Sequence, residues 1–154
     1  MSELYPVANR EVSKITLEGV PDRPGIAAEI FGTLGMQGFN VELVVATGGA
    51  GGRADISFAV SRSDEERVMR ALEEIREEVG ARDLQVNSHV ALVSIVGQHL
   101  STEPGIAGRM FRALSHQGIN IEAISTSMSS VTCMIEEGRT EEAMVALRAE
   151  FAAS

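Results

Sequence analysis

The chain has 154 residues, of which 44% are hydrophobic and 23% charged, an ordinary balance for a protein that folds in water. A formal net charge of −9 disfavours nucleic acid and anionic membrane surfaces as partners. The single cysteine, Cys133, excludes a disulfide within the chain and suits a reducing compartment. No apolar stretch approaches the length of a membrane span, so we expect a cytoplasmic protein.

The most informative feature is a repeat at an offset of 80 residues. Residues 24–42 (PGIAAEIFGTLGMQGFNVE) return as residues 104–122 (PGIAGRMFRALSHQGINIE), and ten of the nineteen positions are identical. A period of this length is too long for a solenoid, and it indicates two copies of one small domain.

The first copy reads as strand, helix, two strands, helix and strand. Alternating and β-branched runs predict its strands over residues 13–19, 40–46, 55–60 and 84–88. Helical spacing of apolar residues predicts its helices over residues 24–37 and 63–79. Asp22 and Pro24 form a reasonable start for the first helix and Gly38 a stop, while Ser63 and Glu66 resemble a capping box for the second. A glycine-rich hairpin over 48–52 joins the middle strands.

The second copy repeats this order but ends one strand short. Its strands are predicted over 90–97, 119–126 and 131–135, and its helices over 105–117 and near 141–151. We expect residues 4–9 (LYPVAN) to supply the missing edge strand, where Pro6 is tolerated because an edge position needs no N–H donor. A frayed N-terminus is the alternative.

These elements predict an α+β fold of two ferredoxin-like βαββαβ domains. Each has an antiparallel sheet with its helices on one face. The first domain, residues 13–88, would be inserted into the second, made of residues 3–10 plus 89–154.

The turn before each repeated helix carries an acid just ahead of Pro-Gly. In the first copy, Asp22 stands beside the backbone amides of Gly25, Ile26 and Ala27, which have no partner within the helix. These amides and the positive end of the helix dipole suit a carboxylate, and the acid suits an ammonium group. Together they favour a zwitterion such as a free amino acid. The alternative is that Asp22 only caps the helix.

Two asparagines, Asn40 and Asn120, follow the repeated helices after a glycine. Each could be a turn residue that accepts an unusual backbone angle. Each could instead present a polar group to the helix start of a neighbouring unit. The sequence leaves both interpretations open.

The segments DRPGIAAEIF…GFNVELV, DISFAV and EPGIAGRMF…GINIEAISTS resemble the tandem ACT domains at the C-terminal end of aspartate kinase. The resemblance covers essentially the whole chain, and it implies amino-acid-binding domains with the first inserted into the second. A chain with these domains and no kinase domain resembles the non-catalytic regulatory β subunit of α2β2 aspartate kinases. The resemblance therefore implies feedback inhibition of aspartate-family amino-acid biosynthesis by threonine, lysine or both, with a catalytic α subunit as partner.

The family's effector lies between the helix start of one ACT domain and the strand start of another, contributed by a second chain of a homodimer. Carried over to this sequence, the resemblance implies a threonine site formed by Asp22, Pro24, Gly25, Ile26, Ala27, Asn120 and Ile121. By pseudo-symmetry it implies a second pocket formed by Glu103, Gly105, Ile106, Asn40 and Val41.

Two departures from the family pattern bear on the effector. Ala46 stands where many relatives have a glutamine that binds the ligand. Met128 stands where lysine-sensitive relatives often have an acid, and without that carboxylate a second ammonium group is recognised less well. We therefore favour threonine over lysine.

Other signals point away from catalysis and cofactors. No nucleophile–base pair or paired carboxylates stand out, so we expect no catalytic residues and no cofactor. The histidines are scattered without metal-ligand spacing, so we expect no metal, and Cys133 reads as a core thiol. Two rival functions remain: a free-standing amino-acid sensor acting on another partner, and a dimerisation module with empty pockets.

Overall fold

The structure is a computed structural model that describes residues 4–48, 50–98, 100 and 104–152. It divides into two units. The inserted unit is Glu11–Ser88, and the outer unit is Met1–Arg10 together with His89–Ser154. One segment of chain thus interrupts the other, as the predicted fold requires.

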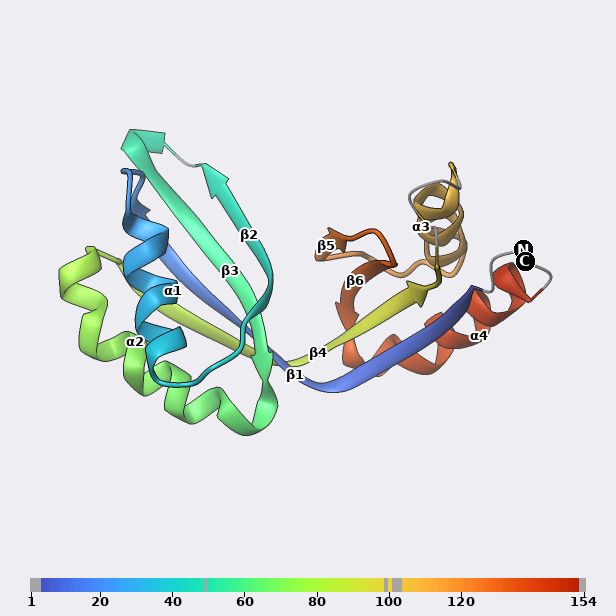
Figure 1. Ribbon diagram of the computed structural model, residues 1–154, viewed down its shortest axis with the longest axis horizontal. Helices are drawn as coiled ribbons and strands as arrows, with labels where there is room; N and C mark the ends of the chain where they lie inside the picture. Colours follow the sequence, from blue (N-terminus) through green and yellow to red (C-terminus); the bar gives the residue numbers. More distant parts are fainter. Residues whose placement is uncertain (1–3, 49, 99, 101–103, 153–154) are drawn as a thin grey trace. The chain divides into compact units, whose positions relative to one another are not determined.

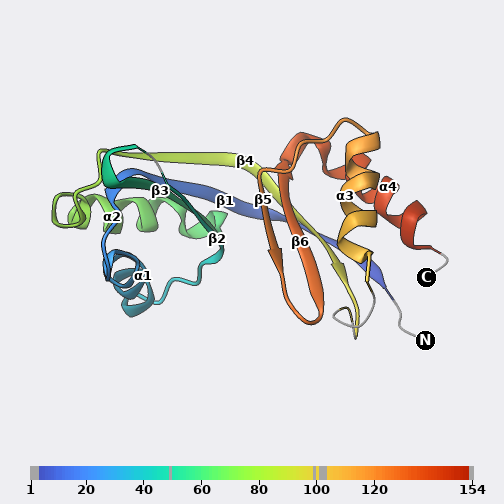
Figure 2. The same cartoon turned by 90° about the horizontal axis from the view of Figure 1, so that it is seen from above.

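The inserted unit holds the latter part of β1 and the first part of β4, with two helices and two strands between them (Figure 1). Its elements are β1 (Tyr5–Pro21), α1 (Ile26–Met36), β2 (Glu42–Gly48), β3 (Arg53–Ser61), α2 (Glu65–Val79) and β4 (Asp83–Val96). The strands lie in the order β2-β3-β1-β4, and β3 pairs antiparallel with both of its neighbours. Figure 2 shows α1 and α2 together on one side of these strands.

The outer unit holds the first part of β1 and the rest of β4. Its remaining elements are α3 (Ile106–His116), β5 (Ala123–Thr126), β6 (Ser130–Glu136) and α4 (Thr140–Phe151). The strand order is β1-β4-β6-β5, so the N-terminal strand occupies the edge beside β4. Pro6 lies in this strand, and the alternative of a frayed N-terminus is wrong for residues 5–10. The predicted fold class, two βαββαβ units with the first inserted into the second, is confirmed.

Two pairs of predicted strands turn out to be single long strands. The segments 4–9 and 13–19 form β1, and the segments 84–88 and 90–97 form β4. No glycine or proline occupies residues 9–13 or 87–91, so nothing in the backbone ends either strand between the units.

Strands β2 and β5 begin later than predicted, at Glu42 and Ala123. The preceding helices end with hydrogen bonds that use the next residues: the Phe39 amide donates to Leu34 O at 3.0 Å, and the Ile119 amide to Leu114 O at 3.1 Å. These bonds close the helix ends and delay the start of strand pairing.

The predicted capping box at Ser63 and Glu66 does not form. Asp64 is the N-cap of α2 and no side chain caps the helix among the described residues. The Ser63 hydroxyl instead shares a hydrogen bond of 3.0 Å with Ser61.

Each unit buries the apolar face of its sheet beneath its two helices. In the inserted unit Phe58 is fully buried, and its ring meets Phe31 edge-on, with centroids 5.2 Å apart. In the outer unit Cys133 is fully buried, with its Sγ 4.0 Å from the sulfur of Met110. Burial raises the pKa of Cys133 to about 12, as desolvation disfavours the thiolate.

No helix in the described ranges is long and apolar enough to span a bilayer.

The Cys133 thiol is therefore expected to resist alkylation in the folded protein. At pH 8, labelling by iodoacetamide should be slow in buffer and complete in denaturant, because only the thiolate reacts and the folded core suppresses it. Mass spectrometry after timed quenching measures this. Rapid stoichiometric labelling in buffer would contradict the buried placement of Cys133.

Candidate functional site

The start of α1 is shaped by a glycine. Strand β1 ends at Pro21, the Asp22 amide donates to Gly52 O at 2.8 Å, and Gly25 is the N-cap with φ 88°. A Cβ at Gly25 would find open space, but this left-handed backbone is costly for other residues. The start of α3 repeats the geometry, with Gly105 at φ 92°.

No side chain of the described residues caps α1. The Asp22 carboxylate is exposed and has no hydrogen-bond partner among the residues that the structure describes. The interpretation of Asp22 as a plain cap is therefore wrong. The Ile26 amide makes only a long hydrogen bond of 3.3 Å to Arg23 O, and the Ala27 amide, on an exposed residue, makes none to a described residue outside the helix. These first-turn amides are therefore available to a ligand.

Two further charges lie at this helix start. Arg23 and Glu29 form an ion pair of 3.2 Å, and both side chains are nearly half exposed. With Asp22 close by in sequence, this helix start combines two acids, one cation and uncapped amides. Such a site can bind the carboxylate and the ammonium group of one small molecule.

The sequence did not reveal the residues that hold the end of β1, just before this helix start. Arg53 donates to Gly19 O at 2.5 Å and to Gly80 O at 3.0 Å, and the Asp55 carboxylate accepts from the Gly19 amide at 2.9 Å. Gly19 has φ 62°, and β1 shifts register between Leu17 and Val20. The one sequence feature that hints at these contacts is the glycine at position 19, just before the turn.

The start of α3 differs in charge. Arg109 occupies the repeat position of Glu29, donating to the Glu150 carboxylate at 2.9 Å and to Glu150 O at 2.7 Å. Its guanidinium also lies 4.5 Å from the centroid of the Phe151 ring. Glu103, the acid predicted for the second pocket, lies outside the described residues.

Two short links, residues 37–41 between α1 and β2 and residues 117–122 between α3 and β5, carry exposed asparagines. Asn40 and Asn120 are exposed and make no hydrogen bond to another described residue. The positive backbone angles belong to the preceding glycines, with φ 85° at Gly38 and 71° at Gly118. The alternative that the asparagines themselves take an unusual angle is therefore wrong.

The residues next to the asparagines anchor the links. Val41 and Ile121 are partly buried, each packed against the core of its own unit. Leu43, just beyond, has φ 58° and lies at a register shift between Glu42 and Val45. Nothing in the sequence signals this strained leucine, and strand β5 has no such shift.

The predicted sets divide between the units in a regular way. Asp22, Pro24, Gly25, Ile26 and Ala27 lie in the inserted unit, as do Asn40 and Val41, whereas Gly105, Ile106, Asn120 and Ile121 lie in the outer unit. Each unit by itself thus contains one helix start and one link. Neither unit contains a complete predicted pocket, because each pocket pairs the helix start of one unit with the link of the other.

The two residues on which the expected preference for threonine rests, Ala46 and Met128, are both exposed. Ala46 is exposed in β2, and Met128 is 77% exposed in the turn between β5 and β6. Among the described residues, no group of three or more His, Cys, Asp or Glu side chains could hold a metal.

Comparison with known proteins identifies both copies. Residues 15–77 and residues 93–151 each match an ACT domain family. The crystal structure of the ligand-free regulatory subunit of aspartate kinase from Thermus thermophilus is 31% identical, with a TM-score of 0.90, over 95% of this chain and 96% of that one. The chain belongs to the ACT-domain regulatory regions of aspartate kinases.

Further relatives support this placement. A crystal structure of aspartokinase alpha and beta subunits is 32% identical with a TM-score of 0.89, covering 96% of this chain and 97% of that one. Aspartate kinases of Stutzerimonas stutzeri and Pseudomonas fluorescens are each 38% identical over 143 residues, which is 93% of this chain. The chain spans only 35% of the length of these two relatives.

Because Asp22 is exposed and does not cap α1, Asp22→Ala should leave the free energy of unfolding nearly unchanged, within about 0.5 kcal/mol as for most surface substitutions. The control Asp55→Ala removes an acceptor from the Gly19 amide and should cost about 1 kcal/mol. Urea denaturation followed by circular dichroism compares the two. A larger loss for Asp22→Ala than for Asp55→Ala would restore Asp22 as a structural residue.

Proposed function

We propose that this ACT-domain region is a non-catalytic regulatory subunit of aspartate kinase that binds threonine, with lysine as the second candidate. The observation that carries the proposal is the uncapped start of α1 beside an exposed acid. The amides at Gly25, Ile26 and Ala27 would donate hydrogen bonds to the effector's carboxylate, and the Asp22 carboxylate would accept hydrogen bonds from its ammonium group.

The effector pocket would be completed by a link from another ACT domain. Asn120 offers an exposed amide with no hydrogen bond to a described residue, and Ile121 offers a partly buried apolar contact. The second pocket would combine Gly105 and Ile106 with Asn40 and Val41, with Glu103 as the acid. We take residues 13–88, and residues 3–10 with 89–154, as the two effector-binding domains.

The preference for threonine rests on the exposed side chains that could face the rest of the effector. Met128 is apolar and 77% exposed, so it offers no counter-charge to the second ammonium group of lysine. Threonine needs only a hydroxyl partner and a methyl contact beyond its zwitterion, and an Asn with an Ile supplies both kinds of group.

Because each pocket would be formed by two chains, binding of the effector would depend on a homodimer. The effector would favour one arrangement of the domains over another and bias a docked catalytic α subunit, as in an α2β2 enzyme, toward lower activity. Coupling of this kind is typically about 1–3 kcal/mol. The crystal structure of aspartokinase alpha and beta subunits supports such a partner by analogy.

Calorimetry with the purified chain should detect threonine binding. Asp22→Ala and Asn120→Ala should each weaken it about tenfold or more, as loss of a charged or buried hydrogen bond costs about 1.5–3 kcal/mol. Glu78→Ala on the exposed face of α2 is the matched control and should bind as the natural chain does. If neither threonine nor lysine binds at millimolar concentration, the effector assignment is wrong.

The same protein should be dimeric by light scattering, and it should co-purify with an aspartate kinase catalytic chain. Binding of threonine at 100 times its dissociation constant should stabilise the dimer by about 2.7 kcal/mol in thermal unfolding. A free-standing sensor would bind threonine without retaining a kinase. An empty dimerisation module would show no stabilisation.

A further inference from the structure

The link that carries Asn120 and Ile121 is held by a side chain from elsewhere in the outer unit. Arg139, the N-cap residue of α4, donates from Nη2 to Gln117 O at 2.7 Å and from Nη1 to Gly118 O at 3.4 Å. These two carbonyls belong to the end of α3. A guanidinium at the carbonyl end of a helix is favoured both by hydrogen bonding and by the helix dipole.

Arg139 is itself held in place by an acid one turn later. Its Nε and Nη2 donate to the two carboxylate oxygens of Glu142, at 3.2 and 2.6 Å. The hydrogen bond to Glu142 raises the pKa of Arg139, and the same bond lowers the pKa of Glu142. A two-oxygen contact of this kind fixes the plane of the guanidinium and so aims its remaining donors.

The link is therefore fixed on both sides of Asn120. On one side, the Ile119 side chain is buried and its amide donates to Leu114 O at 3.1 Å. On the other side, the Glu122 amide donates to Met134 O at 2.8 Å. Arg139 adds the restraint on Gln117 and Gly118, so little freedom remains for the two residues between.

The corresponding ion pair in the inserted unit makes different contacts. At an offset of 75 residues, Asp64 and Arg67 occupy the positions of Arg139 and Glu142, and they form an ion pair with the two charges exchanged. Arg67 lies with its guanidinium carbon 5.2 Å from the centroid of the Phe39 ring. Among the described residues it donates to no backbone carbonyl of the α1 end.

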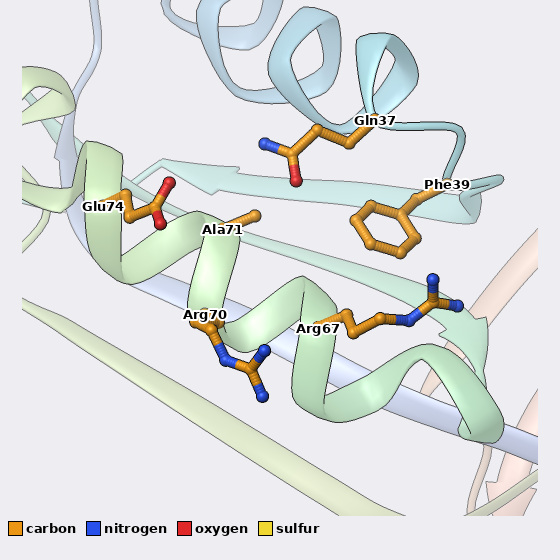
Figure 3. A pocket seen from close by; sticks show the side chains of 6 residues that line it. All are labelled: Gln37, Phe39, Arg67, Arg70, Ala71 and Glu74. Carbon is orange, nitrogen blue, oxygen red and sulfur yellow. The ribbon is translucent and has the colours of Figure 1, made fainter.

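An open cavity remains beneath that end of α1. It has a volume of about 240 Å³ and is lined by Gln37, Phe39, Arg67, Arg70, Ala71 and Glu74 (Figure 3). Just beyond the link, Leu43 in strand β2 has φ 58°. The Asn40 link thus lacks the guanidinium restraint that the Asn120 link has.

We propose that Arg139 is a positioning residue for Asn120 and Ile121, and that it makes the effector site containing them the tighter of the two sites. This inference rests on the proposed binding of an amino acid at these links. A link already held in its bound position loses less conformational freedom on binding, so the ligand binds it more tightly. The Asn40 link has the buried Phe39 and its amide hydrogen bond to Leu34 O, but no guanidinium contacts its carbonyls among the described residues, so its site binds more weakly.

Threonine titrations by calorimetry on the full chain test the affinity. Arg139→Gln should weaken the tighter site about tenfold, within the range for substitutions that act on a site without touching its ligand. Arg139→Lys keeps the positive charge but loses the planar guanidinium with its several donors, and it should also weaken this site. The matched substitution in the inserted unit, Arg67→Gln, should leave the tighter site unchanged.

A variant of the ion pair separates positioning from stability. Glu142→Gln removes the same ion pair as Arg139→Gln but leaves the donors to Gln117 and Gly118 in place. It should match Arg139→Gln in urea denaturation yet weaken threonine binding less. If the two variants lose affinity equally, or if neither loses any, Arg139 acts only on stability and the proposal is overturned.

Amide hydrogen exchange in the ligand-free protein tests positioning without an effector. Arg139→Gln should accelerate exchange at residues 118–121 relative to the natural chain, whereas Arg67→Gln should not. Unchanged exchange there would overturn the positioning role. Faster exchange in a chain that binds neither threonine nor lysine would instead overturn the proposed function and, with it, the claim about affinity.

Discussion

Both units depend on β1 and β4, which run without a break from one unit into the other. The strand order places β1 beside β4, and neither unit completes its four strands without a part of each. A shift of one residue in β1 would turn Ile15 and Leu17 out of the core, so burial fixes the register. Because α1 follows directly after β1, the same register places the start of α1 and Asp22.

A second constraint acts at the helix starts, where a glycine replaces the usual capping residue. With φ 88° at Gly25 and 92° at Gly105, the chain enters each helix through a conformation that side chains disfavour. A serine or aspartate at the N-cap would satisfy the first amides from within the chain. Glycine leaves them to a ligand, at some expense in stability. In the proposed function, the effector's carboxylate would take the place of the missing cap.

The sequence predicts the features that depend on residue type. The repeat marks Gly25, Gly105, Gly38 and Gly118, because these positions need positive φ, and apolar spacing marks both cores. It misses features that depend on the tertiary structure. The Arg139 contacts span 21 and 22 residues of sequence, and the φ of 58° at Leu43 has no residue-type signal.

The two copies share the backbone of their helix starts but differ in their charges. The helix starts share their glycines, yet Glu29 pairs with Arg23 at one, whereas Arg109 pairs with Glu150 at the other. At the starts of α2 and α4, the ion pairs Asp64–Arg67 and Arg139–Glu142 hold the acid and the arginine in opposite order. The exchange at the starts of α2 and α4 preserves an ion pair in each unit. It changes what the guanidinium contacts: Arg139 donates to Gln117 O and Gly118 O, whereas Arg67 lies against the Phe39 ring. Under the proposed positioning role of Arg139, this difference would make the two sites unequal in affinity.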